Sequence, residues 1–591
     1  MCGISGEIRF DGKAASTDRV GAMLRSMQRR GPDAGGVIAR DNVAFGHRRL
    51  KIIELSEKGQ QPMTDPYLGL SVVFNGCIYN HKEIRSRLES SGYKFFSNSD
   101  TEVVLKSYHA WGERCVEEFN GMFAIAIHER DTGNIFLARD RLGIKPLYYF
   151  KSPGVLRFAS SLPALVKSMK MKPDIDPVAL HYYMTFHSVI PAPRTIFEQI
   201  SKIPPGMTYT FDAVGMYRGR RYWDINNVEK NRSELPDNEN QIIDILLEKL
   251  RISAKRRTEA DVTVGVLLSG GVDSSMVVSL LSDTGYADLK TFSVGFEDTP
   301  EENGNEFKYS DLIAREYGTD HHRFTVNSDQ IIENLPDCLS AMSEPMVSHD
   351  NIGFYLLGKY VAEHVKVIQS GQGADELFGG YHWYQALDGS SNPVDDYARA
   401  FFDRDHDEYK SAISDRYVQS DFSREFVEQQ FATAGADNPV DKALRLDTSV
   451  MLVDDPVKRV DNMTMAWGLE ARVPFLDHEV VEFAVSIPPH LKLRNGGKYI
   501  LKEAARRIIP EKVIDRPKGY FPVPALKYLR GSVLEYVHDA LNNQAARERI
   551  IFRKEYVDML FENPVAHITP LKGSKLWQSA ILELWMQSHG I

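Results

Sequence analysis

The chain has 591 residues, of which 43% are hydrophobic and 26% are charged, with 42 glycines and 28 prolines. Its length predicts several domains with cores of their own, and the composition excludes a disulfide-stapled module, a fibrous protein and wholesale disorder. The formal net charge of −10 provides no global positive field for nucleic acid or an anionic membrane. The composition therefore favours an enzyme that acts on small molecules.

Cysteine usage and the lack of long apolar segments indicate the compartment. The four cysteines show no CxxC spacing, which argues against a zinc site or a disulfide framework and favours a reducing compartment. The first residues are charged and glycine-containing rather than apolar, and no later segment reaches the roughly 18 apolar residues of a membrane span. We expect a cytoplasmic protein.

The first 215 residues follow a strand-rich pattern. Short strands joined by turns are predicted here, for example at 71–74, 123–127 and 135–137. Two stretches with helical spacing, around 19–28 and 82–90, predict helices layered on these sheets in an α+β arrangement. From about residue 226 to 239 the composition becomes polar and charged, so we predict a linker at 216–240 and a second domain at 241–591.

A parallel sheet is predicted after the linker. Apolar runs typical of strands alternate with helical stretches, at 262–268, 290–296, 323–326 and 365–369. This alternation predicts a doubly wound α/β domain with a parallel sheet. Beyond Tyr381, helical patterns dominate to the end of the chain.

Cys2 is a candidate nucleophile. Methionine is normally removed before a small residue, so the mature chain is expected to begin with a cysteine whose α-amino group lies beside its thiol. An α-amino group has a reference pKa of about 7.7–8.0 and can accept the thiol proton at neutral pH without a histidine. A cysteine alone is more often inert, so this hypothesis depends on other motifs.

Three further motifs offer groups that would bind an amide substrate. Asn75-Gly76, at the end of a predicted strand, offers a side-chain amide and a backbone N–H at a turn, two donors suited to an oxyanion. An Asn-Gly pair alone is usually only a hairpin turn. Arg49 would bind an α-carboxylate and Asp100 an α-ammonium, whereas each alone is more often a surface charge. Their combination indicates a site.

Seven motifs follow one another along the N-terminal part of the chain. They are MCGI at the start, RGPD at 30–33, GHRRL at 46–50, NGCIYN at 75–80, SDTE at 99–102, GMFAIA at 121–126 and RDRLGIKPLY at 139–148. In this order they resemble class II glutamine amidotransferases of the asparagine synthetase type. The resemblance implies an N-terminal-nucleophile (Ntn) hydrolase domain, an αββα sandwich, over residues 1–215. It also implies that Cys2 attacks glutamine, that Asn75 and Gly76 stabilise the oxyanion, and that Arg49 and Asp100 hold the amino-acid end of glutamine.

One position departs from the family pattern. The family usually has NGEIYN, and in this chain Cys77 stands in place of the glutamate. Part of the polar clamp on the amino group of glutamine is therefore expected to be missing.

A glycine turn between an apolar strand and a helix predicts phosphate binding. The segment Ser269-Gly-Gly-Val-Asp-Ser-Ser275 presents backbone N–H groups and a helix N-terminus to an anion. It lacks the ending of a Walker A loop and resembles the loop of enzymes that cleave ATP between the α and β phosphates, leaving an adenylated substrate. The resemblance implies that ATP is bound by Leu268, Ser269, Gly270, Gly271, Val272, Asp273, Ser274, Ser275, Ser370 and Gly371.

Acidic residues in a second glycine turn are candidates for a Mg²⁺ site. The turn at 370–376 follows another predicted strand, so Asp375 is expected at the same sheet edge as Asp273. Both carboxylates would bind a Mg²⁺ ion on the pyrophosphate, the alternative being that Asp375 caps the next helix. Lys498 aligns with the family lysine that neutralises charge on the acyl-adenylate and pyrophosphate. Two candidates for further phosphate contacts are Arg516 and Lys518.

The acceptor of the amide group is less well determined than the reaction. Aspartate is the usual acceptor of the family. In this chain, however, Gln372 stands where asparagine synthetases carry a glutamate that is thought to accept a proton from ammonia. A neutral amide cannot act as such a general base. Longer strings at 343–350, 369–375, 455–470 and 513–526 resemble enzymes that amidate N-acetylglutaminylglutamine, an acetylated dipeptide that bacteria use as an osmoprotectant. We therefore expect glutamine, ATP and this dipeptide as substrates, with aspartate as the alternative.

Hypotheses from other classes are less well supported. A glutaminase whose ATP-binding half has decayed conflicts with the intact loop at 269–275, and an RNA-modifying enzyme conflicts with the acidic net charge. A pure binding protein gives no reason for two intact sites. We expect no nucleic-acid or membrane partner, and a homodimer is compatible with the sequence.

Overall fold

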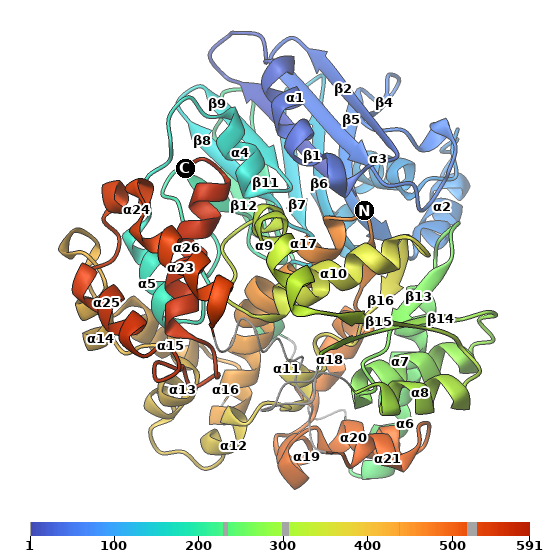
Figure 1. The fold of residues 1–591 in the computed structure, drawn as a ribbon. Helices are drawn as coiled ribbons and strands as arrows, with labels where there is room; N and C mark the ends of the chain where they lie inside the picture. Colours follow the sequence, from blue (N-terminus) through green and yellow to red (C-terminus); the bar gives the residue numbers. More distant parts are fainter. Residues whose placement is uncertain (1, 228–234, 298–305, 437, 517–528) are drawn as a thin grey trace.

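Two antiparallel six-stranded sheets lie face to face in the N-terminal part of the chain (Figure 1). The computed structural model describes residues 2–591 apart from 228–234, 298–305, 437 and 517–528. In strand order the first sheet consists of β10 (Ile200–Lys202), β8 (Tyr148–Ser152), β9 (Val155–Ala159), β1 (Gly3–Arg9), β3 (Val43–Arg49) and β2 (Ala34–Arg40). The second consists of β12 (Tyr217–Arg221), β11 (Met207–Phe211), β7 (Ile135–Arg139), β6 (Gly121–Glu129), β5 (Leu70–Ile78) and β4 (Met63–Asp65).

The two sheets share an apolar core and are covered by helices on their outer faces. Ile4, Phe45 and Val73 are fully or almost fully buried in one cluster between the sheets. Helices α1 (Thr17–Ser26) and α4 (Leu162–Ser168) pack on the first sheet, and α3 (Asp100–Trp111) packs on the second with α2 (His81–Ser90) beside it. The result is the expected αββα sandwich, in which alternate strand residues face either the shared core or the helices.

A parallel five-stranded sheet forms the second half of the fold. Its order is β15 (Asp320–Val326), β14 (Lys290–Phe296), β13 (Val264–Leu267), β16 (Val367–Gln369) and β17 (Glu470–Arg472). Helices α7 (Val272–Asp283) and α8 (Phe307–Glu316) lie on one face and α10 (Asp350–Ala362) on the other (Figure 1). The chain runs outward from β13 to β15 and then returns to the other side of β13. This reversal between β13 and β16 is where doubly wound sheets bind ligands.

Most of the expected elements are confirmed. The hairpin from β6 to β7, the helices α1 and α2 and the strands β13, β14 and β16 form within a few residues of the predicted ranges. Beyond residue 381 the described elements are helical apart from β17. Strand β12 pairs with β11, so the second sheet extends past residue 215 into the range expected as a linker, of which 228–234 lies outside the described residues.

One local prediction was wrong. Asn75 and Gly76 were expected at a turn, but β5 continues to Ile78, and the two residues pair with Ala124 and Phe123 of β6. A Cβ on Gly76 would lie 2.1 Å from the Met122 carbonyl oxygen, so only glycine fits between the strands here. The partner strand follows some forty residues later, and local turn propensity does not report such a partner.

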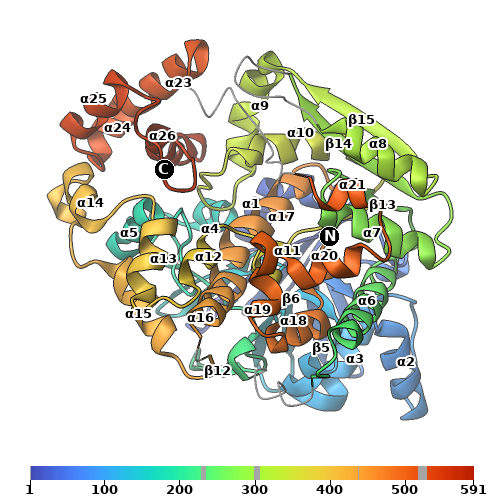
Figure 2. The ribbon, with the colours of Figure 1, turned by 90° about the horizontal axis from the view of Figure 1, so that it is seen from below.

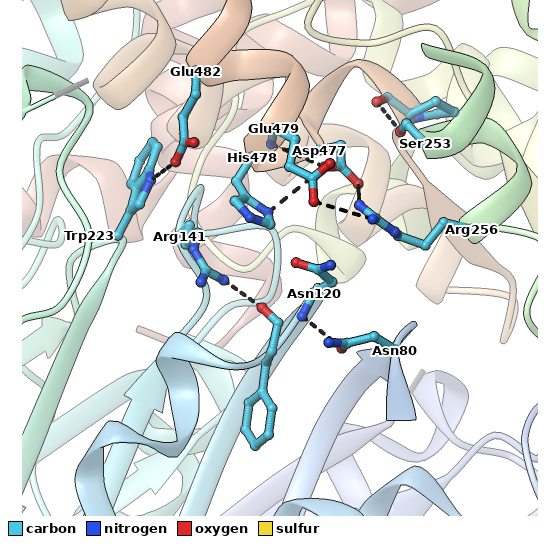
Figure 3. A network of polar contacts seen from close by, with 12 residues as sticks. Asn80, Asn120, Arg141, Trp223, Ser253, Arg256, Asp477, His478, Glu479 and Glu482 are labelled. Carbon is cyan, nitrogen blue, oxygen red and sulfur yellow. Dashed lines mark hydrogen bonds and ion pairs between the residues drawn. The ribbon is translucent and has the colours of Figure 1, made fainter. Parts of the chain in front are cut away.

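Polar contacts join the two halves of the chain. The Trp223 indole donates to Glu482 on α18 (His478–Ser486) at 2.8 Å, and Asp477, just before α18, forms an ion pair with Arg256 (Figure 3). Deeper inside, Arg30 forms a 2.9 Å ion pair with the buried Asp461. Among the described residues, no helix combines the length and the apolar character needed to cross a bilayer.

Candidate active sites

A small cavity at the start of β1 brings the predicted N-terminal residues together. Cys2, Arg49, Gly76 and Asp100 all line it, and Cys2 is only 7% exposed. Asn75 is the immediate neighbour, because its Oδ1 accepts a hydrogen bond from the Cys2 backbone nitrogen at 2.9 Å. We call this cavity the Cys2 pocket.

Two donors face the Cys2 pocket from strand β5. The Asn75 Nδ2 is buried and has no hydrogen-bond partner among the described residues. The N–H of Phe123, opposite Gly76, donates to Asp140, and its carbonyl accepts from the Asp140 N–H. The polar groups of Phe123 therefore point away from Gly76, which leaves the Gly76 N–H on the open edge of β5. Asn75 and Gly76 thus present a pair of donors at the Cys2 pocket.

Both flanking N–H groups on the same edge of β5 are used by residues that line the pocket. The Phe74 N–H donates to Gln61 at 2.7 Å, and the Ile78 N–H donates to Asp100 at 3.1 Å. Asp100 begins α3, and burial raises the pKa of its carboxyl group. The pocket therefore has its two donors in the centre and a buried acid on one side.

The Arg49 side chain is held by a loop rather than by an acid. Its guanidinium donates to the carbonyl oxygens of Ser56, at 2.9 Å, and Glu54. Because both acceptors are neutral carbonyl groups, they do not neutralise the positive charge of Arg49. This side chain lies at the pocket wall and is 3% exposed. Such a fixed guanidinium is suited to a carboxylate ligand.

Burial also determines the state of the Cys2 thiol. Desolvation raises the pKa of Cys2 above its ordinary value, so the thiol is protonated at neutral pH. A nucleophilic Cys2 therefore needs a base close to its sulfur.

Two residues of β17, from the second half of the chain, close the Cys2 pocket. Glu470 and Arg472 line it, and the Arg472 Nε donates to Glu470 Oε1 at 2.6 Å. Burial alone would raise the pKa of Glu470, but nearby positive charges, Arg472 and Lys145 among them, lower it to about 2. No sequence signal assigned these two side chains to the N-terminal site.

The Cys77 side chain contacts Arg472, one of the two β17 residues that close the Cys2 pocket. Its sulfur lies 3.7 Å from Arg472 Nη2, and burial raises the pKa of its thiol well above the ordinary range. The position at which the family usually has a glutamate is thus occupied by a neutral thiol next to a buried guanidinium. The arginine keeps its ion pair with Glu470, and its Nη1 donates to the carbonyl oxygens of Arg257 and Glu259 at 2.9 and 2.8 Å.

The two glycine turns of the second half meet at the reversal point of the parallel sheet. The first follows β13 and leads into α7, whose N-cap residue Gly271 offers no side-chain cap. The second follows β16, and a Cβ on Gly371 would lie 2.9 Å from Asp273 Cβ and 3.0 Å from the Ser274 nitrogen. This close approach requires glycine and places both turns around one open helix N-terminus, a suitable position for phosphate.

Lys498 connects the two predicted metal ligands. Its Nζ lies 2.7 Å from Asp273 Oδ2 and 2.9 Å from Asp375 Oδ1. The residue has φ +56° just before α20 (Tyr499–Ala505), and the two acids raise its pKa further above the ordinary lysine value despite burial. A Cβ on Gly380 would lie 2.4 Å from Lys498 Cε, so the lysine also depends on that glycine. The three charged groups therefore converge as expected.

A buried acid lies next to the half-buried Asp375. Glu376, on α11 (Ala374–Phe378), accepts a 2.8 Å hydrogen bond from the Tyr381 hydroxyl. Burial, together with the negative charge of Asp375, raises the pKa of Glu376 to about 7. Gln372 lies in the same turn, half-buried.

Arg516 reaches the first glycine turn but is already paired. Its guanidinium forms two hydrogen bonds with Glu306, at 2.5 and 2.9 Å, and one of its nitrogens would lie 3.7 Å from a Cβ on Gly271. Lys518 lies outside the described residues.

The chain matches two known families over most of its length. Residues 1–223 match "Glutamine amidotransferase domain", and residues 246–587 match "Asparagine synthase". The chain belongs to the asparagine synthase family. It is an asparagine synthetase-type amidotransferase with both the glutamine-hydrolysing and the synthetase part.

Individual relatives match almost the whole length of this chain. It is 31% identical to "Asparagine synthetase [glutamine-hydrolyzing] 1" of Bacillus subtilis, over 99% of this chain and 96% of the relative. It is 28% identical to "Asparagine synthetase [glutamine-hydrolyzing] 3" of the same organism, over 95% and 93%. It is also 26% identical to "Amidase chry2" of Gibberella zeae, over 93% of each chain. The Cys2 pocket falls in the first matched region, except for Glu470 and Arg472, and the glycine turns fall in the second.

Proposed function

We propose that this protein amidates the terminal carboxyl group of N-acetylglutaminylglutamine with ammonia from glutamine, and that ATP is cleaved to AMP and pyrophosphate. The general reaction follows from the family. The assignment of the acceptor depends on Gln372, which replaces the glutamate of asparagine synthetases in the turn beside Asp375. Family membership with 31% identity leaves the acceptor open, and one relative of similar coverage is named an amidase rather than a synthetase.

In the proposed glutaminase half, which we assign to residues 1–215 together with β12, the mature chain begins at Cys2. The nitrogen that contacts Asn75 Oδ1 is then the α-amino group, and it accepts the thiol proton as Sγ attacks the side-chain carbon of glutamine. The Asn75 Nδ2 and the Gly76 N–H stabilise the oxyanion. The C–N bond breaks, ammonia leaves with the proton, and water hydrolyses the thioester to glutamate.

In the proposed synthetase half, residues 241–591, the turns after β13 and β16 bind the phosphates of ATP. The acceptor carboxylate attacks the α-phosphorus, pyrophosphate leaves, and ammonia then displaces AMP from the acyl-adenylate. Lys498 neutralises negative charge that develops on these phosphates. Asp273 and Asp375 converge and supply the hard oxygen ligands that Mg²⁺ prefers, so they would hold that ion. Bound Mg²⁺ would neutralise the leaving pyrophosphate.

The position of β17 supports coupling of the two halves. The Arg472 side chain lines the Cys2 pocket, while its carbonyl oxygen accepts a 2.8 Å hydrogen bond from the Ser370 N–H, at the start of the second phosphate turn. We infer that ammonia released at Cys2 passes along this strand to the synthetase half. Such a path keeps it from protonation by water.

The first experiment measures pyrophosphate release with ATP, Mg²⁺ and glutamine in the presence of either N-acetylglutaminylglutamine or L-aspartate, with product masses. Amidation of the dipeptide alone is expected. Amidation of aspartate alone would refute the proposed acceptor and leave an asparagine synthetase that works without the glutamate. Pyrophosphate release with either acceptor excludes a glutaminase with an inert second half.

The matched variant for the acceptor is Gln372→Glu, which introduces the family glutamate into the same turn. If Gln372 helps to determine the acceptor, the variant gains turnover with aspartate relative to the dipeptide. Glutamine hydrolysis without acceptor serves as the control, because Gln372 does not line the Cys2 pocket.

A further inference from the structure

Three side chains from distant parts of the chain converge away from both sites. They are His181 on α5 (Pro177–Thr185), His406 at the start of α14 (His406–Ala412), and Asp421, which precedes α15 (Phe422–Ala432). Figures 1 and 2 show α5 beside α14 and α15 at the edge of the molecule. None of the three side chains lines the Cys2 pocket or belongs to the phosphate turns. The function proposed above does not use this cluster, and the one local role of these atoms among the described residues is that Asp421 Oδ1 caps α15 by accepting from the Arg424 N–H at 3.2 Å.

The distances between the possible ligand atoms fit one metal ion. His181 Nε2 lies 3.2 Å from His406 Nδ1 and 3.8 Å from Asp421 Oδ1, and all three atoms lie within 4.8 Å of one another. In a tetrahedral site with bonds of about 2.0–2.2 Å, ligand atoms are separated by roughly 3.3–3.6 Å. Shifts of a few tenths of an ångström to about one ångström would complete such a site.

Hydrogen bonds fix which nitrogen of His181 is free to bind a metal. The Thr185 hydroxyl donates its proton to the His181 carbonyl oxygen at 2.7 Å, so its oxygen can only accept from the imidazole Nδ1, 3.2 Å away. The Ser423 hydroxyl donates to Thr185 Oγ1 at 2.7 Å, because the Thr185 proton is already used, so Ser423 too can only accept from Nδ1, 3.2 Å away. Nδ1 therefore carries the proton, and the lone pair is on Nε2, directed toward His406 and Asp421. Metal-binding histidines are typically oriented in this way by a partner on the other nitrogen.

Burial keeps the His181 ring neutral. The side chain is 1% exposed, and desolvation, with a smaller effect of His406, lowers its pKa to about 3. The rings of Tyr409 and Phe422 pack against it, with centroids 4.5 and 5.8 Å away. Neutral imidazole is the form that binds metals, and the partly exposed His406 and Asp421 leave access for an ion.

We propose that His181, His406 and Asp421 bind one divalent transition-metal ion, best matched by Zn²⁺, with water as the fourth ligand. Two imidazole nitrogens and one carboxylate oxygen suit Zn²⁺ better than Mg²⁺. Because His181 Nε2 accepts in the 3.2 Å contact, His406 Nδ1 carries a proton there. Besides the shifts given above, binding requires this proton to move to Nε2 of His406, so the ring stays neutral. The ion would join α5, which lies between strands β9 and β10 of the first sheet in the chain, to helices α14 and α15 of the second half. The cysteine spacing gave no sign of this site because no cysteine takes part in it.

The test uses the full chain without an affinity tag, stripped with a chelator and then titrated with Zn²⁺ against a chromophoric competitor. One zinc ion per chain and a higher Tm in zinc are expected. Co²⁺ in place of Zn²⁺ should give the visible absorption of a tetrahedral ion. His406→Ala and Asp421→Asn should weaken zinc binding at least about tenfold, since even changes next to ligands cost that much. Both residues are partly exposed, so these variants are expected to fold.

The control is His538→Ala, which removes a 58% exposed histidine on α23 (Gly531–Asn542), outside the cluster. It should bind zinc like the unmodified chain. Zinc binding that is weak in the unmodified chain, or equal in the His406→Ala variant, would overturn the proposal. In that case the 3.2 Å contact between the two histidines is an ordinary hydrogen bond.

Discussion

Replacement of Asn75 by alanine tests the proposed oxyanion site directly. Asn75 makes two separate contributions, because its Oδ1 accepts from the Cys2 nitrogen at 2.9 Å and its buried Nδ2 is left without a described partner. Loss of one oxyanion donor costs about 2.7–4 kcal/mol of transition-state stabilisation, which is a factor of about 100–1000 in kcat. We therefore expect Asn75→Ala to lower glutamine hydrolysis by that factor.

The assay compares two donors in the same preparation. Glutamate release from glutamine should fall, whereas pyrophosphate release and product formation with ammonium chloride should be retained, because the phosphate turns are unchanged. Asn75→Asp keeps an oxygen for the Cys2 nitrogen but removes the donor, so it should lose at least as much activity as the alanine variant. Asn42→Ala is the control, since Asn42 donates to the Arg9 carbonyl at the far end of β1. A kcat for glutamine within about threefold of the unmodified enzyme would refute the assignment of Asn75.

The other predictions concern the remaining charged groups. Cys77→Glu places a carboxylate beside Arg472 and should lower the KM for glutamine about tenfold, with Cys77→Ala as the neutral control; an unchanged KM would show that this position does not contact the substrate. Lys498→Ala should lower the rate of pyrophosphate release at least about 100-fold and leave glutaminase activity unchanged. The control Lys502→Ala, one turn further along α20, should leave both activities unchanged. Glu376 has a folded-state pKa of about 7, above its ordinary 4.5, so its ionisation destabilises the fold increasingly as the pH rises through that window. Glu376→Gln should therefore gain up to about 3 kcal/mol over the unmodified chain between pH 5 and 8 in thermal melts, and a constant difference would contradict the shifted pKa.

Much of the fold was predictable because its signals are local. Apolar runs followed by glycine turns predicted β13 and β16, and the periodic stretches before Gln28 and Ser90 predicted α1 and α2. The turn at Asn75-Gly76 was mispredicted, since strand pairing with β6, and not local propensity, determines the backbone there. The convergence of Asp273, Asp375 and Lys498 was expected from the family motifs, and their 2.7 and 2.9 Å contacts agree with it.

The sequence by itself determined the family and predicted the site chemistry, since motif order indicated a cysteine nucleophile, two donors and a phosphate turn, each a short run of neighbouring residues. Only the tertiary structure decided which distant residues complete the sites. Glu470 and Arg472 close the Cys2 pocket from the other half of the chain, and His181 meets His406 across more than two hundred residues. Such contacts depend on how sheets and helices pack against one another. Packing buries side chains according to shape and charge, and spacing along the chain carries no record of it.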